Sequence, residues 1–140
     1  MKVWLLYTGY EDRFEGAYSE VAKEAREQQF YEEALKNREH KNAVLAEEIE
    51  EFKALRQPYI EEADRLLAIE REAKEVNNTY LLKETRQQRK VALRQVDKLT
   101  NEIKRRETNI YNSMLLVKKD ILSFYGSRRY WQEEHVIDVE

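Results

Sequence analysis

The 140-residue chain contains no cysteine, which excludes disulfides, thiol nucleophiles and metal sites built on cysteine. It has 1 proline and 3 glycines, too few for a fold made mainly of short strands and turns. The apolar run Val3–Leu6 is far too short for a signal peptide or a membrane span, and no later run is longer. We therefore expect a soluble cytoplasmic protein that does not enter a membrane.

Charged residues, in contrast, are abundant. They make up 38% of the chain, against 41% hydrophobic residues, a balance that suits long charged helices with narrow apolar stripes. The 25 basic and 28 acidic side chains leave a formal net charge of -3. This near-balance favours neither general affinity for nucleic acid nor attachment to a membrane surface.

The clearest periodic pattern lies in the stretch from Val96 to Phe124. Its apolar residues recur every seven positions, with further apolar residues at the intervening steps of three or four. The first set comprises Val96, Ile103, Ile110, Val117 and Phe124, and the second Leu99, Met114 and Ile121. Such a row needs another helix to cover it, as in a coiled coil. The pattern predicts a long helix from about Tyr80 to Tyr125 that stops at Gly126.

An earlier helix is predicted to start after Ser19, whose hydroxyl can cap the first turn. Its apolar positions keep a heptad phase if Arg56 and Glu70 occupy two of the buried positions. These positions hold Leu45, Ile49, Phe52, Tyr59, Ala63, Leu66 and Ala73. Because the phase continues through Pro58, we expect the proline to kink a continuous helix and not to end it.

Asn77–Asn78–Thr79 is the predicted reversal between the two helices, since asparagine tolerates the left-handed conformation and Thr79 can cap the second helix. Residues 47–75 carry ten acids and five bases, whereas residues 83–106 carry nine bases and three acids. Folding at this point lays the acidic helix against the basic one. We therefore expect an antiparallel helical hairpin.

The two ends of the chain alternate with period two, which is typical of β-strands. Lys2–Thr8 and Arg13–Tyr18 predict a β-hairpin, with apolar groups on both faces of its first strand, and the tail Ser127–Glu140 predicts a third strand. The expected fold is α+β and predominantly α, with a long antiparallel coiled-coil hairpin on a small three-stranded antiparallel sheet. We expect a single domain, residues 1–140, with residues 1–18 and 127–140 forming the sheet and residues 19–125 the helical stalk.

The sequence shows no recognisable catalytic, cofactor or metal motif. Its two histidines, His40 and His135, lack the spacing of metal ligands, and neighbouring glutamates on a helix point apart. We therefore expect no catalytic, cofactor or metal site, and assign structural or surface roles to both histidines.

Two groups of basic residues are candidates for contact with a polyanion or a partner. The first lies on the basic helix, residues 83–106, and the second at the predicted junction of helix and strand, where two arginines precede Tyr130 and Trp131. The candidates are Arg86, Arg89, Lys90, Arg94, Lys98, Arg128 and Arg129. The basic helix has no aromatic residue for base stacking, and the acidic helix offers it an internal partner.

The stretch Lys2–Asp12 (KVWLLYTGYED), followed by Phe14–Ser19 (FEGAYS), resembles a class of small uncharacterised proteins of bacteriophages and mobile elements. In that class two such strands lead into a helix, and a final strand ends in an acidic tail, here Tyr130–Glu140. The resemblance covers only the two ends of the chain, because the helix between them is greatly expanded here. It implies a phage-like accessory protein and no catalytic residues.

From these observations we expect a non-enzymatic protein-interaction module, plausibly a phage-encoded inhibitor or modulator of a host protein of defence or gene expression. One alternative is a protein that sequesters nucleic acid or nucleotides through residues 83–106. Another is a structural coiled coil of a virion or scaffold. Self-association, as a dimer, is expected in each case, because apolar Leu115 and Leu122 flank the main row.

Overall fold

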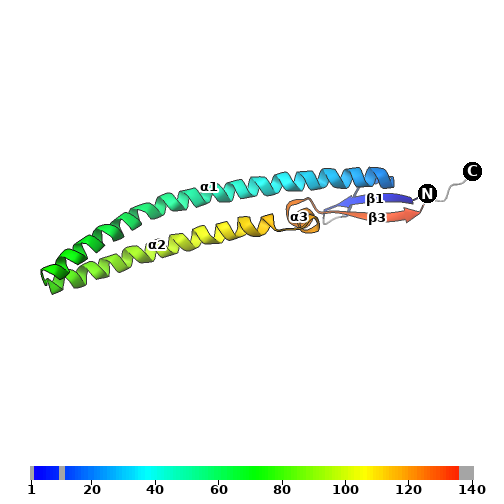
Figure 1. The fold of residues 1–140 in the computed structure, drawn as a ribbon. Coiled ribbons are helices and arrows are strands. Elements are labelled where there is room, and N and C mark those ends of the chain that lie inside the picture. Colours follow the sequence, from blue (N-terminus) through cyan, green and yellow to red (C-terminus); the bar gives the residue numbers. More distant parts are fainter. Residues whose placement is uncertain (1, 10–11, 136–140) are drawn as a thin grey trace, which may run out of the picture. The chain divides into compact units, whose positions relative to one another are not determined.

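The structure, a computed structural model, describes residues 2–9 and 12–135. It is predominantly helical, with two long helices and a three-stranded antiparallel sheet (Figure 1), which confirms the predicted α+β fold. In chain order the elements are β1 (Lys2–Thr8), β2 (Arg13–Tyr18), α1 (Glu20–Glu75), α2 (Thr79–Met114), α3 (Lys118–Tyr125) and β3 (Arg129–His135).

The chain divides into two compact units. One, the sheet unit, comprises Met1–Asn42 and Ser113–Glu140, and the other, the hairpin unit, comprises Ala43–Asn112. The division falls inside α1 and close to the end of α2, so the sheet unit combines two segments that are distant in sequence, whereas the hairpin unit is one continuous segment. The first part of α1 and the whole of α3 belong with the strands.

In the sheet unit, β1 lies between β2 and β3 and pairs with both in antiparallel register. Leu6 is opposite Gly16 on one side and Trp131 on the other. The hairpin turn is entered through Gly9, whose φ of 76° lies in the region that favours glycine. The predicted hairpin and third strand are thus confirmed over the described residues, while residues 136–140 of the predicted strand lie outside them.

One face of this sheet packs against α1. Leu6 has no exposed surface, and its neighbour on the same face, Trp4, lies under the ammonium of Lys23 at 3.8 Å from the ring centroid. Trp131 meets Tyr18 edge-on and lies 6.4 Å from the ring of Phe30. Through these aromatic contacts α1 covers one face of the sheet, which a small three-stranded sheet needs for stability.

The first long helix, α1, begins as predicted after Ser19, whose Oγ accepts a hydrogen bond from the backbone N–H of Ala22 at 3.3 Å. It then continues without a break to Glu75, with Pro58 inside it. The expectation that the proline does not end the helix is confirmed. Pro58 itself is exposed, so its ring lies on the solvent side of the helix.

The reversal after α1 is at the predicted place. Asn77 adopts the left-handed conformation with φ 54°, and the N–H of Asn78 bonds the carbonyl of Ala73 at 2.9 Å, which closes the helix. The capping assignment, however, was wrong by one residue. Asn78, and not Thr79, caps α2, because its Oδ1 accepts from the N–H of Leu81 at 3.1 Å.

In the hairpin unit, α1 and α2 bury facing heptad rows. The buried residues of α1 include Ile49, Ala63, Leu66 and Ala73, and those of α2 include Thr85, Ala92 and Ile103. Arg56 occupies a position within the α1 row, as predicted, and donates to Thr100 Oγ1 at 3.1 Å. Tyr59 was wrongly predicted in this row. Tyr59 is 40% exposed, whereas the next residue, Ile60, is half-buried. A tyrosine hydroxyl favours a position that water can reach.

The prediction of one continuous helix to Tyr125 was wrong. The second helix ends at Met114, and α3 begins only at Lys118. The carbonyl of Ser113 accepts from the guanidinium of Arg38 at 3.4 Å and from the N–H of Leu116 at 3.4 Å, so α-helical bonding stops there. As a result Val117 and Phe124, predicted in the buried row, are 63% and 64% exposed.

The third helix ends as predicted. Gly126 follows its last turn and donates its N–H to the carbonyl of Leu122 at 3.1 Å. A Cβ at Gly126 would lie 2.5 Å from that carbonyl oxygen, which explains why glycine is required at this position. Within α3, Ile121 is the buried residue and anchors the helix in the sheet unit.

Candidate functional site

Two of the predicted basic residues converge on one carboxylate in the hairpin unit. Arg86 Nε donates to Glu70 Oε1 at 2.9 Å, and Arg89 Nη1 to Glu70 Oε2 at 3.5 Å. Hydrogen bonding from Arg86, with the charges of both arginines, lowers the pKa of Glu70 below its usual value. Glu70 also occupies a position within the heptad row of α1, as predicted, with its side chain 16% exposed.

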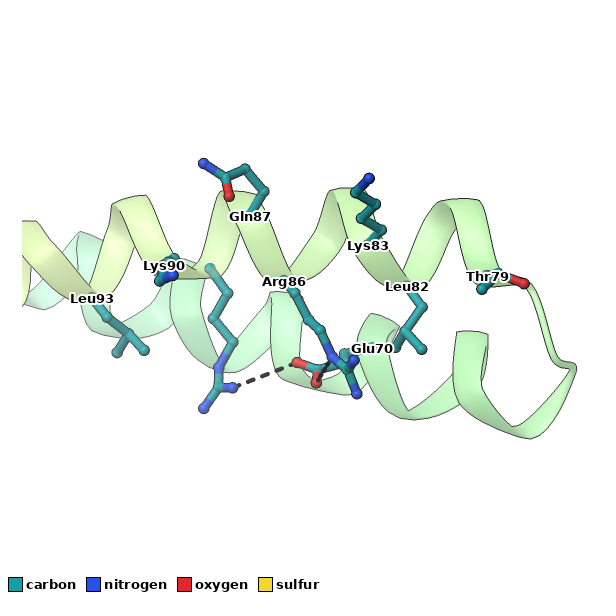
Figure 2. A pocket seen from close by; sticks show the side chains of 9 residues that line it. Glu70, Thr79, Leu82, Lys83, Arg86, Gln87, Lys90 and Leu93 are labelled. Atoms are coloured by element: carbon teal, nitrogen blue, oxygen red, sulfur yellow. Dashed lines mark hydrogen bonds and ion pairs between the residues drawn. The ribbon is translucent and has the colours of Figure 1, made fainter.

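These residues lie at a shallow groove of about 600 Å³ beside the start of α2. In Figure 2, Arg86 reaches toward Glu70, whereas Lys83 and Gln87 point away from it. The lining combines four cations with a single carboxylate: Glu70, Thr79, Leu82, Lys83, Arg86, Gln87, Arg89, Lys90 and Leu93. The groove is therefore electropositive even with Glu70 ionised.

The structure therefore brings Arg86, Arg89 and Lys90 together. Arg94 and Lys98 continue along the exposed side of α2 beyond the groove. Among the described residues, Lys90, Arg94 and Lys98 make no ion pair or hydrogen bond, although Lys98 contributes to lowering the pKa of Glu102. The acidic helix thus neutralises only part of the basic one.

Arg106, another base of α2, is paired inside the hairpin unit. Its Nε donates to Glu48 Oε2 at 2.6 Å and its Nη1 to Glu102 Oε2 at 2.8 Å, while its guanidinium stacks 4.4 Å from the ring of Phe52. The side chain is only 14% exposed. This arginine is part of the packing between the helices and is not available to a ligand.

The second candidate pair, Arg128 and Arg129, lies in the sheet unit. Arg129 stacks on Phe30 at 3.8 Å from the ring centroid and pairs with Glu33 at 3.3 Å. It therefore ties β3 to α1. The backbone carbonyl of Arg128 accepts from the N–H of Gly9 at 2.9 Å, so the residue also fixes the end of the hairpin.

Both arginines line a pocket of about 600 Å³ that also includes Lys119, Phe124 and Trp131. Trp131 belongs to the sheet core, where its ring contacts those of Tyr18 and Phe30. The guanidinium of Arg129 is already paired inside the fold. We therefore interpret this corner as a structural junction.

The sheet also has a second face, which the sequence analysis did not consider as a site. It is formed by the alternate residues of β1, namely Val3, Leu5 and Tyr7, with Phe14 and Tyr130 on the flanking strands. We call it the outer sheet face. Its aromatic rings form a cluster, since Tyr7 lies 5.7 Å from Phe14 and stacks on Tyr130 at 5.3 Å.

Two of these rings are largely open to solvent. Phe14 is 55% exposed and Tyr130 43%, whereas Leu6 on the opposite face is completely buried. The only sequence signal for this surface was that β1 has apolar residues on both of its faces. Such a strand is expected to be covered on both faces, but of the described helices α1 covers one face only.

Acidic residues border the outer sheet face. The Tyr130 hydroxyl is hydrogen-bonded to Asp12, and this bond raises the pKa of Tyr130. Glu134, opposite Val3 in the register, is exposed as well. The border of the face therefore carries both signs of charge, because Arg128 lines a small pocket with Asp12 and Tyr130, and Arg13 lines another with Phe14.

Within residues 2–9 and 12–135, no group of three or more histidine, cysteine, aspartate or glutamate side chains is placed to hold a metal ion. His40 is exposed, and His135 Nε2 lies 3.3 Å from Glu133. In the same part of the chain, no helix is both long enough and apolar enough to cross a membrane.

Comparisons with protein-family models, with curated proteins and with solved structures found no match to this chain. The resemblance of the two chain ends to small phage proteins therefore stays a prediction.

Proposed function

We propose that this protein is a non-enzymatic interaction module that docks a partner protein on its outer sheet face. The observation that carries this proposal is the aromatic cluster of Tyr7, Phe14 and Tyr130, which leaves two rings about half exposed on the face opposite α1. Exposed aromatic clusters of this kind are typical of binding surfaces, because rigid rings bury much apolar area at little entropic cost.

The rim of this face favours a particular kind of partner. Asp12 and Glu134 place negative charge beside the aromatic centre. A partner surface with an apolar centre and a basic rim would be complementary to it. We propose a different protein as the occupant, with basic groups that meet Asp12 and Glu134, and a second copy is an outcome of the test below.

The identity of that protein is a separate matter. The expectation that the chain is phage-encoded and inhibits a host protein depends on the resemblance of its ends alone, and it stays a prediction. The outer sheet face supports docking of a protein irrespective of the source of the partner.

Affinity capture with quantitative mass spectrometry tests the proposal. The bait is the full chain, produced in the cells that naturally contain it, and is compared with the variant Phe14→Ser/Tyr130→Ser. We expect a protein that co-purifies with the unmodified chain and is reduced at least tenfold with this variant, because the substitutions remove the exposed rings.

A matched control is Tyr80→Ser/Tyr111→Ser, which removes two exposed rings of α2, 79% and 64% exposed. The control should retain the partner. Equal recovery with the outer-face variant, or no protein above background, would refute the proposal. If the unmodified chain had the solution mass of a dimer and the Phe14→Ser variant that of a monomer, the face would be assigned to a second copy instead.

A further inference from the structure

The exposed bases of α2 form a continuous stripe. Successive residues of a helix are rotated by about 100°, so Lys83, Lys90 and Arg94 lie on one side. The complete set, which we call the basic stripe, falls within an arc of about 120° and comprises Lys83, Arg86, Lys90, Arg94, Lys98, Lys104 and Arg105. All seven are exposed.

The stripe lies opposite the buried row of the same helix. Ala92 and Ile103, 6% and 3% exposed, are about 180° to 200° around the helix from Lys83. Asp97 is the one acidic residue on the arc. The apolar side of α2 is thus occupied by α1, while the solvent side carries a nearly uninterrupted row of positive charge.

Internal pairing leaves most of this charge available. Arg86 is engaged by Glu70, and Arg105 by Glu102 at 2.9 Å. Within the described residues, Lys83, Lys90, Arg94 and Lys104 make no ion pair or hydrogen bond. Since charges further apart than about 8 Å are largely screened at physiological salt, the acids that offset the stripe most are those beside it, Glu70, Asp97 and Glu102.

We infer that the basic stripe is a binding site for the phosphate backbone of double-stranded nucleic acid, recognised without reading its sequence. The stripe spans residues 83–105, a length of about 33 Å at 1.5 Å per residue, close to one turn of a duplex. Its linear shape suits a rod-like polyanion.

The chemistry of the stripe disfavours other polyanions. No aromatic residue lies between residues 83 and 105, so unpaired bases have no stacking platform. Ala92 and Ile103 of α2 are buried, whereas Val91 and Leu93, which flank the stripe, are 50% and 38% exposed. Two partly exposed side chains offer lipid little apolar area, so a membrane surface would be held mainly by charge. Gln87 and Asn101, which share the arc, can add neutral hydrogen bonds to phosphate or sugar.

The salt dependence of binding tests this inference. Anisotropy of a labelled 24-base-pair duplex is measured with the full chain over a series of KCl concentrations. Each phosphate contact contributes about -0.9 to the slope of log K against log salt. The variant Lys90→Gln/Arg94→Gln/Lys98→Gln should therefore flatten the slope by about 2.7 and weaken binding about tenfold or more.

The matched control is Lys53→Gln/Arg71→Gln/Lys74→Gln, which removes three exposed bases of α1 and changes the net charge equally. It should leave the slope unchanged. Arg94→Glu, a single exposed substitution checked by circular dichroism, should also weaken binding and guards against loss of folding in the triple variant.

Several results would overturn the inference. These are no binding of the duplex at low salt, equal effects of the two triple variants, and tighter binding of a single strand of the same sequence. Binding of vesicles containing phosphatidylserine with no binding of the duplex would assign the stripe to a membrane surface. Since the stripe belongs to the hairpin unit, none of these results bears on the outer sheet face.

Discussion

Polar side chains within the heptad rows are informative at the scale of single residues. Glu70 and Arg106 occupy positions that usually hold apolar residues, and each is compensated by partners on the facing helix. The position of Glu70 could be predicted from the sequence because the heptad phase of α1 passes through it. The partners of both residues could not, since these depend on the register between the helices. Such pairs specify register more than they stabilise the fold.

The acid stability of the hairpin unit should depend on Glu70. Its pKa is lowered in the folded protein, so its contribution to stability is complete above the usual glutamate pKa and is lost as the pH falls through the lowered value. We expect Glu70→Gln to reduce the fall in the free energy of unfolding between neutral and acidic pH, measured by urea denaturation. Glu84→Gln, which removes an exposed carboxylate of α2, is the control. Identical pH profiles for Glu70→Gln and the unmodified protein would contradict this role.

The cap of α2 provides a second test at this scale. Asn78→Ala should lower the free energy of unfolding by about 1 kcal/mol, because the N–H of Leu81 loses its acceptor. Thr79→Ala should cost much less, since Thr79 is already the first helical residue. A larger cost for Thr79→Ala in urea denaturation would restore the assignment made from the sequence.

At the scale of elements, the heptad pattern predicted the existence of both long helices more reliably than their ends. The row continues in sequence to Phe124, yet α2 stops at Met114. What ends it is a tertiary contact, the hydrogen bond from Arg38 to the carbonyl of Ser113. The two residues are far apart in the chain, and no local pattern indicates that they meet. Close to this end the polar Ser113 is buried, 5% exposed.

Pro58 allows a direct test of the continuity of α1. A proline in a helix interior removes one backbone hydrogen bond and crowds the preceding turn. Because α1 passes through Pro58 and the residue is exposed, we expect Pro58→Ala to raise the free energy of unfolding by about 1 to 3 kcal/mol. The neighbouring exposed substitution Gln57→Ala should change it by less than about 0.5 kcal/mol. A destabilised Pro58→Ala protein would indicate that the helix is interrupted there.

At the scale of the whole molecule, the sequence was sufficient to predict that distant ends share one sheet. Period-two alternation at both ends, with a reversal at Asn77–Asn78, leaves few other ways to cover the strands. The outer sheet face was not predicted as a site, since periodicity shows that residues are apolar but not which face remains uncovered. The division into two units was also not visible, because it falls inside α1.

The fold removes one reason to expect self-association. The buried rows of α1 and α2 cover each other within one chain in the hairpin unit, so a second copy is not needed to cover them. The expected dimer therefore depends on other surfaces and stays a prediction. Light scattering coupled to size exclusion measures the solution mass directly.

The central claim is that a single chain doubles back, which brings Asn42 beside Ser113. Their side chains exchange hydrogen bonds of 2.8 and 3.1 Å between the amide of Asn42 and the hydroxyl of Ser113. Because the chain has no cysteine, Asn42→Cys/Ser113→Cys introduces the only two thiols for a short bifunctional reagent. In a mixture of ¹⁴N- and ¹⁵N-labelled protein, we expect mass spectrometry to find cross-linked peptides that carry one label only. Cross-linked peptides of mixed label would contradict the account.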